Sequence, residues 1–242
     1  MAERKKDHSP AEMTPEYKNM VRQLLESQGV REFMAANIFS DALKFIPTLR
    51  LKELLAKQVV EELEHYEETI RLYHDLGGDL EAVIEEKVKK YGGVPYVKSW
   101  FELAVCQFLY DRAGEFHLAE YRQCSYLPYA EIVDKILAEE EEHESFGERA
   151  MVEACRNPQY RRQVQQLFNK WLSFSLTSFG RPGTPGNRFA LAVGLKTRDS
   201  GEVMQDFIDD IKPGMVKCGL TFPSDLGVET PANLDLSLPA AA

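Results

Sequence analysis

Two short stretches of the sequence each carry a glutamate and a histidine three residues apart. The first holds Glu62 and His65, and the second holds Glu140 and His143. On a helix, side chains at this spacing share a face, so each carboxylate and imidazole can converge on one point. Carboxylate oxygen together with imidazole nitrogen suits iron, and manganese accepts the same ligands. The two motifs therefore predict a metal site built by two helices.

Each motif also follows an acidic residue at nearly the same distance along the chain. Glu32 precedes Glu62 by 30 residues, and Asp111 precedes Glu140 by 29 residues. Such spacing fits two helical hairpins, each giving one carboxylate and then a Glu-x-x-His pair, as in di-iron helix bundles. Both acids lie in apolar stretches, where a charge is costly to bury unless it is paired or bound to metal. The predicted ligands of two metal ions are Glu32, Glu62, His65, Asp111, Glu140 and His143.

Other side chains compete for the same roles. Glu61 and Glu139 lie four residues before the two histidines and share their helix faces. Glu115 lies one turn after Asp111, and His117 follows two residues later. Either of the last two is an alternative ligand or a partner of a ligand. The spacing favours Asp111 and leaves the choice open.

Long amphipathic helices must position these groups, and apolar periodicity indicates where they lie. We expect a helix from Thr14 to about residue 39 that Gly29 kinks or breaks, and helices over residues 47–77, 98–122, from Pro128 onward and 158–178. A short charged helix over 79–91 lies outside the bundle, residues 179–186 form a loop, and a last helix spans 200–211 and resumes after Pro213. This pattern predicts an all-α fold, a ferritin-like four-helix bundle with additional C-terminal helices. The expected domains are a flexible N-terminal tail (1–13), a helical domain (14–220) and an irregular C-terminal tail (221–242).

Composition narrows the classes of function. The chain has 242 residues, a formal net charge of −10 and a sequence pI near 5.1, which opposes binding to nucleic acid. No apolar run is long enough for a membrane span, and the charged N-terminus lacks a secretion signal. The four cysteines are scattered and form no metal-binding pair. We expect reduced thiols and a cytoplasmic location.

Several motifs outside the ligands resemble one family. The chain resembles the phenylacetic acid catabolic proteins, in particular the catalytic subunit of the phenylacetyl-CoA epoxidase oxygenase component, over about residues 14–225. The resemblance is carried by Arg31-Glu32-Phe33, Pro47-Thr48-Leu49-Arg50, Glu61-Glu62-Leu63-Glu64-His65, Ser99-Trp100, Tyr110-Asp111, Ser125-Tyr126-x-Pro128-Tyr129-Ala130, Glu139-Glu140-x-x-His143 and Phe179-Gly180.

This resemblance implies a ferritin-like fold and a carboxylate-bridged di-iron centre that activates O2. It assigns the same six residues, from Glu32 to His143, as metal ligands and catalytic groups. It also implies insertion of one oxygen atom into an organic substrate, with an aryl-CoA thioester as a candidate. The expected partners are an electron-donating reductase and either further copies of the chain or a related helical subunit.

The chain departs from the family pattern in two places. Both metal-binding motifs are rich in glutamate where the family has small or apolar residues, and the chain is shorter at its C-terminus. These departures leave the substrate, reductase and partner open. A basic cluster, made of Arg181, Arg188, Lys196 and Arg198, either meets a CoA phosphate or forms a solvated loop.

Three rival functions stay open at this point. The first is an iron-handling ferroxidase, and the second is a non-catalytic helical subunit of an oxygenase. An intact set of six ligands counts against the second. The third is a tRNA-modifying di-iron hydroxylase, which the net charge of −10 disfavours.

Overall fold

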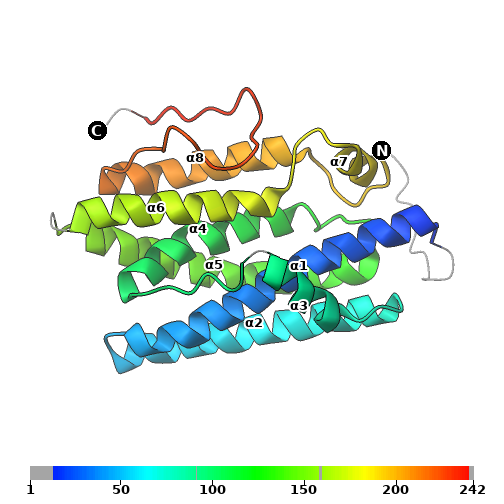
Figure 1. Cartoon of the computed structure of the whole chain (residues 1–242), viewed down its shortest axis with the longest axis horizontal. Coiled ribbons are helices and arrows are strands. Elements are labelled where there is room, and N and C mark those ends of the chain that lie inside the picture. Colours follow the sequence, from blue (N-terminus) through cyan, green and yellow to red (C-terminus); the bar gives the residue numbers. More distant parts are fainter. Residues whose placement is uncertain (1–12, 91, 158–159, 240–242) are drawn as a thin grey trace.

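The structure is a computed structural model that describes residues 13–90, 92–157 and 160–239 (Figure 1). Within these ranges the chain forms helices and connecting segments, and no β-strand occurs. None of the helices in the described ranges is long and apolar enough to cross a membrane. The flexible tail expected over residues 1–13 falls outside these ranges apart from Met13.

Four long helices form the bundle. They are α1 (Pro15–Ala42), α2 (Leu49–Asp75), α4 (Trp100–Ala119) and α5 (Leu127–Cys155). The side chains of Thr14, Thr48 and Ser99 cap α1, α2 and α4 by accepting backbone N–H bonds in the first turn. Helix α1 pairs with α2 and α4 pairs with α5, so the chain folds as two hairpins (Figure 1). The prediction of an all-α, ferritin-like bundle is confirmed.

Shorter helices cover the hairpins. Helix α3 (Leu80–Lys90) packs against α1, and α6 (Arg161–Leu176) packs against α4. Helix α8 (Ser200–Cys218) lies against α4 and α5. The described residues also include the 3-10 turns η1 (Leu43–Phe45) and η3 (Thr177–Phe179) and the short helix α7 (Pro185–Ala192).

Three local expectations were wrong, and tertiary packing explains two of them. Helix α1 passes through Gly29 unbroken. A Cβ at this position would lie 2.8 Å from Ile84 Cδ1, so the glycine is there because it lets α3 approach α1 closely. Helix α8 runs through Pro213 to Cys218 and does not stop at Ile211; buried side chains on both sides of the proline hold it in place. The expected loop over 179–186 ends at Thr184, which caps α7, and the helix itself begins at Pro185.

Residues 221–239 contain no helix, yet this segment touches the helical domain. Leu226 is buried, and the ring of Phe222 lies 6.4 Å from that of Phe168 on α6. The Gln205 side chain on α8 accepts a hydrogen bond from the backbone of Asp235. All four cysteines carry free, buried thiols.

Candidate metal centre

The six predicted ligands come from all four helices of the bundle. Glu32 lies on α1, Glu62 and His65 on α2, Asp111 on α4, and Glu140 and His143 on α5. Their exposed fractions range from 0 to 2%. The i, i+3 spacing places each glutamate and histidine of a motif on the inner face of its helix.

These side chains form two groups of potential ligand atoms. One group contains Glu32, Glu62, His65 and Glu140, and the other contains Asp111, Glu140 and His143. Within each group the ligand atoms lie within 4.8 Å of one another. Glu140 belongs to both groups, so the two positions adjoin through one carboxylate.

The donor atoms at this centre fit metal ions. Both carboxylate oxygens of Glu62, one oxygen each of Asp111 and Glu140, and Nδ1 of both histidines are buried without a hydrogen-bond partner among the described residues. Unpartnered buried polar atoms are costly, and a bound cation would relieve that cost. Four acidic side chains in one core, with charges totalling −4 when ionised, match two divalent ions.

The carboxylates titrate abnormally because they are buried together. Burial and then the neighbouring Glu140 and Glu32 raise the pKa of Glu62 well above its ordinary value. Burial and then Glu140 do the same to the pKa of Asp111. Burial also favours the neutral form of Glu32, but its close interaction with His65 outweighs burial and leaves that pKa lowered. Such clusters of shifted carboxylates are typical of functional sites.

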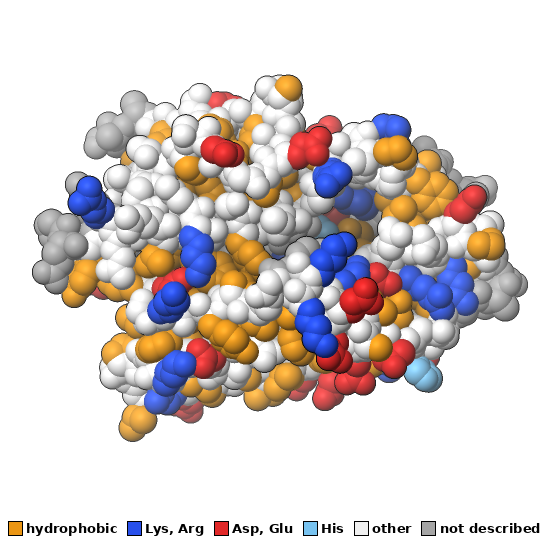
Figure 2. All heavy atoms as spheres, viewed as in Figure 1, with side chains coloured by type: hydrophobic (Ala, Val, Ile, Leu, Met, Phe, Trp, Pro, Cys, Tyr) orange, Lys and Arg blue, Asp and Glu red, His pale blue; other side chains and the backbone are white. Residues whose placement is uncertain are grey.

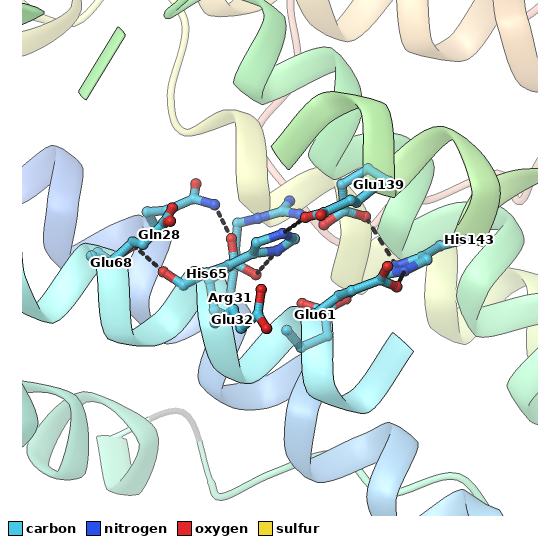
Figure 3. Close-up of polar contacts among 12 residues, drawn as sticks. Gln28, Arg31, Glu32, Glu61, His65, Glu68, Glu139 and His143 are labelled. Carbon is cyan, nitrogen blue, oxygen red and sulfur yellow. Dashed lines mark hydrogen bonds and ion pairs between the residues drawn. The ribbon is translucent and has the colours of Figure 1, made fainter. Parts of the chain in front are cut away.

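Each histidine is also held by a glutamate from the opposite hairpin. Glu139 on α5 lies 2.7 Å from Nε2 of His65 on α2, and Glu61 on α2 lies 3.1 Å from Nε2 of His143 on α5 (Figure 3). Burial lowers the pKa of His65, but its contacts with Glu32, Glu140 and Glu139 raise it overall to about 9. Glu61 and Glu139 thus face the outer ring nitrogens, while Nδ1 of each histidine faces the carboxylate cluster.

Four further polar side chains surround the centre, and their roles were not predicted from the sequence. Gln28, one turn before Glu32, donates a hydrogen bond to its carboxylate. Gln107 donates to Gln58 at 2.9 Å, linking α4 to α2. The buried guanidinium of Arg31 stacks 5.2 Å from the Tyr110 ring, beside Glu32. Their positions one helical turn from, or next to, a ligand were the available signal.

The alternative ligands on α4 lie elsewhere. Glu115 is half-buried and His117 is buried, and neither joins the two ligand groups. Nε2 of His117 lies 3.3 Å from the hydroxyl oxygen of Tyr121. Of the three candidates on α4, Asp111 is the one that lies with other predicted ligands, Glu140 and His143.

Two cavities lie on the α1 and α4 side of the centre. A cavity of about 120 Å³ is lined by Arg31, Met34 and Tyr110, each next to or near a predicted ligand. A cavity of about 270 Å³ is lined by His117, Arg181 and Lys196 among others. Ser27 and Ser178 line both cavities.

The basic cluster of the sequence divides between two settings. Arg181 and Lys196 line the larger of these two cavities. Arg198 pairs with Glu120 at 2.8 Å and also pairs with Asp206, and Arg188 donates to the backbone oxygen of Gly183. Only half of the cluster therefore faces the cavity.

Comparison with known proteins shows the family of this chain. One relative is a component of the 1,2-phenylacetyl-CoA epoxidase of Escherichia coli (strain K12). It is 27% identical over 194 residues, which cover 76% of this chain and 62% of that protein. The chain thus spans less than two thirds of the length of this relative. The family model of the phenylacetic acid catabolic protein matches residues 1–231. The chain, with its buried carboxylate and histidine centre, belongs to the phenylacetic acid catabolic protein family.

Proposed function

We propose that this chain is the oxygen-activating subunit of a di-iron oxidoreductase that inserts one oxygen atom into an organic substrate. The observation that carries the proposal is the set of six buried predicted ligands, five of which have donor atoms without a hydrogen-bond partner among the described residues. Bound iron would supply the redox chemistry by which O2 reacts with an organic molecule. Manganese accepts the same ligands, so the identity of the bound metal must also be measured.

The side chains of this centre have separate tasks in the proposal. Glu32, Glu62, Asp111 and Glu140 offer carboxylate oxygens, and His65 and His143 offer Nδ1. Glu61 and Glu139 hold the outer nitrogens of the two rings, which fixes their tautomer and orientation. The apolar side chain of Phe39 is fully buried and meets the His143 ring edge-on at 6.3 Å, so it helps to keep bulk water from the centre.

The substrate class rests on the two cavities beside α1 and α4. The smaller one approaches the ligands through Met34 and Tyr110, and it suits the reacting acyl or aryl group. The larger one carries Arg181 and Lys196, whose charges suit a phosphate-bearing carrier. The relative's name specifies phenylacetyl-CoA, so an aryl-CoA thioester is the first substrate to try. A reductase and a helical partner subunit complete the proposed assembly.

Metal loading tests the ligand set. We expect Fe(II) loading under anaerobic conditions to give about two irons per chain, as a two-metal centre requires. Glu62→Ala should lose bound iron, because both of its oxygens face the cluster. Glu67→Ala, at an exposed position of the same helix, is the matched control. Equal metal content in the Glu62→Ala variant and the parent chain would contradict the ligand assignment.

A single-turnover reaction tests the chemistry. Chemically reduced, iron-loaded protein is mixed with labelled O2 and an aryl-CoA thioester, and the product is examined by mass spectrometry for one labelled oxygen. Iron oxidation without labelled product for any thioester would favour the iron-handling alternative. A chain that stays empty under Fe(II) loading would favour the non-catalytic helical subunit.

A further inference from the structure

A third cavity lies at the end of the bundle where α2 begins and α5 ends, on the left in Figure 1. Its volume is about 690 Å³, and its apolar wall consists of Leu51, Leu54, Trp100, Phe101, Phe146 and Ala150. It shares no lining residue with the two cavities beside α1 and α4. The proposed oxygenase chemistry therefore does not account for it.

The size and lining of this cavity resemble those of small-molecule sites. Ligand pockets measure about 300–1,000 Å³ and are lined mainly by apolar and aromatic side chains. Here Trp100 meets Phe146 edge-on at 5.5 Å, and Phe101 lies 4.9 Å from Tyr160. Aromatic walls of this kind accept a flat ring or a hydrocarbon chain.

The charges at the rim indicate the sign of the ligand. Arg50 on α2 and Arg149 on α5 both line the cavity, and both are exposed. Neither has an ion-pair or hydrogen-bond partner within the described part of the chain. The acid at the rim, Glu153, is paired with Arg156. A chain with a net charge of −10 thus presents a local excess of positive charge over an apolar floor.

Charged side chains are unevenly distributed over the face of the molecule drawn in Figure 2. On the face drawn in Figure 2, hydrophobic side chains gather with Lys and Arg side chains at the left end of the molecule, the end at which the cavity lies. Acidic side chains are more numerous toward the right and lower edge of the same face (Figure 2).

We propose that this cavity binds an amphipathic organic anion, an aryl or acyl carboxylate. Its hydrocarbon body would lie against Trp100 and Phe146, and its carboxylate would face Arg50 and Arg149. Guanidinium groups bind carboxylates through charge-assisted hydrogen bonds, which are stronger than neutral ones. This proposal is independent of the metal centre, since none of the six predicted metal ligands lines the cavity.

The chain contains a built-in reporter for the test. It has two tryptophans, of which Trp171 is fully buried and Trp100 is half-buried in this cavity. The full chain is titrated with 4-phenylbutyrate and with decanoate, and tryptophan emission is followed. The corresponding neutral amides are titrated in parallel. We expect saturable changes with the acids and much weaker binding of the amides. Trp100→Phe should lose the signal, while calorimetry still detects binding.

Three variants test the geometry. Arg149→Gln should weaken binding of the acids about tenfold, as expected for loss of one charge-assisted hydrogen bond. Ala150→Phe should abolish binding by filling the cavity while both arginines stay. Arg71→Gln, at an exposed position near the other end of α2 without an ion-pair partner among the described residues, is the matched control and should bind normally. Thermal melts confirm that each variant is folded.

Separate outcomes would overturn this proposal. Amides that bind as tightly as acids would remove the role of the arginines, and absence of any binding would remove the site. If sedimentation shows that the chain self-associates and Ala150→Phe makes it monomeric, the cavity is a protein interface. Glu62→Ala should bind the acids as well as the parent does, so failure of the metal proposal and failure of this one are distinguishable.

Discussion

At the scale of single residues, each histidine of the centre presents its two ring nitrogens to different helices. Nδ1 of His65 faces Glu32 at 3.7 Å, and its Nε2 lies 2.7 Å from Glu139. His143 repeats this arrangement with Glu62 and Glu61. The glutamate that contacts Nε2 comes from the other hairpin in both cases. The orientation of each imidazole ring therefore depends on how the two hairpins pack together.

Removing one outer glutamate tests this dependence. Glu139→Gln keeps the size of the side chain and removes its charge, so His65 should be a poorer ligand. Changes of this kind cost about 10–100-fold in metal affinity. Competition with a chelator for Fe(II) measures the affinity. Glu64→Gln, which changes an exposed acid that pairs with Lys135 on the surface, is the control. Unchanged affinity in Glu139→Gln would show that the contact does not support the metal.

His117 provides a pH-dependent prediction away from the ligands. Burial, aided by the charge of Arg31, lowers the pKa of His117 well below its ordinary value. The unfolded chain takes up a proton there below about pH 6.5, and the folded chain does not, so stability falls as the pH drops further. His117→Gln should lose less stability on acidification, by up to about 1.4 kcal/mol per pH unit. Urea unfolding at neutral and acidic pH measures this, and parallel curves for both proteins would contradict it.

The sequence could predict which acids meet, but not which of two neighbouring acids points inward. Glu32 and Asp111 precede the two motifs by nearly the same number of residues. Two helical hairpins of similar length are enough to bring each acid level with its motif. Glu61 and Glu62 both share a face with His65, so periodicity alone does not separate their roles. The separation depends on the position of α5, which places His143 within reach of Glu61 and surrounds Glu62 with other carboxylates.

At the scale of the helices, capping signals were reliable, and single breaker residues were not. The helix start expected at Thr14 was found, and Thr48 and Ser99 cap α2 and α4 in the same way. Gly29 and Pro213 interrupt nothing, because contacts with other helices outweigh their local cost. Helix α7 was missed although Thr184 and Pro185 form a cap and first-turn signal, since the surrounding glycines and prolines favour a loop. Such tertiary effects are invisible in a local pattern.

The close approach of α4 and α5 depends on Gly147. A Cβ at this position would lie 2.5 Å from the backbone nitrogen of Phe108, which is too close for any real contact. Gly147→Ala should therefore force the helices apart and lower the free energy of unfolding by about 1–3 kcal/mol, as overpacking does. Since His143 lies one turn earlier, iron affinity should fall as well.

Urea unfolding and iron titration check this prediction. Gly186→Ala is the control, because its nearest contact would be an ordinary one of 3.7 Å to Met20. We expect that variant to match the parent. A Gly147→Ala protein as stable as the parent would mean that α4 and α5 can adjust without loss.

At the scale of the whole molecule, the centre lies between two hairpins that each contribute three predicted ligands. The α1–α2 hairpin carries Glu32, Glu62 and His65, and the α4–α5 hairpin carries Asp111, Glu140 and His143. Without cations, four buried acids must be protonated or repel one another. Metal ions would therefore act as a bond between the hairpins as well as a catalytic group.

Metal removal tests this bond. Fe(II)-loaded protein should melt at a higher temperature than the chelator-treated chain, because binding to the folded state alone stabilises it by about 4 kcal/mol at a thousandfold excess over the dissociation constant. Calorimetry under anaerobic conditions measures both states. Glu62→Ala should show no such difference. Identical melting of loaded and empty parent protein would show that the ions do not link the hairpins.

The order of the ligands along the chain has a consequence for biosynthesis. During translation the first hairpin leaves the ribosome with three ligands, and the other three follow only from residue 111 onward. Domains fold as their residues emerge, N-terminal parts first. On the proposed ligand assignment, nascent protein would therefore meet metal ions with half a site, and both positions would be complete only when the second hairpin docks. Metal insertion belongs at the end of assembly, and iron-starved cells should accumulate folded chains that load after iron is restored.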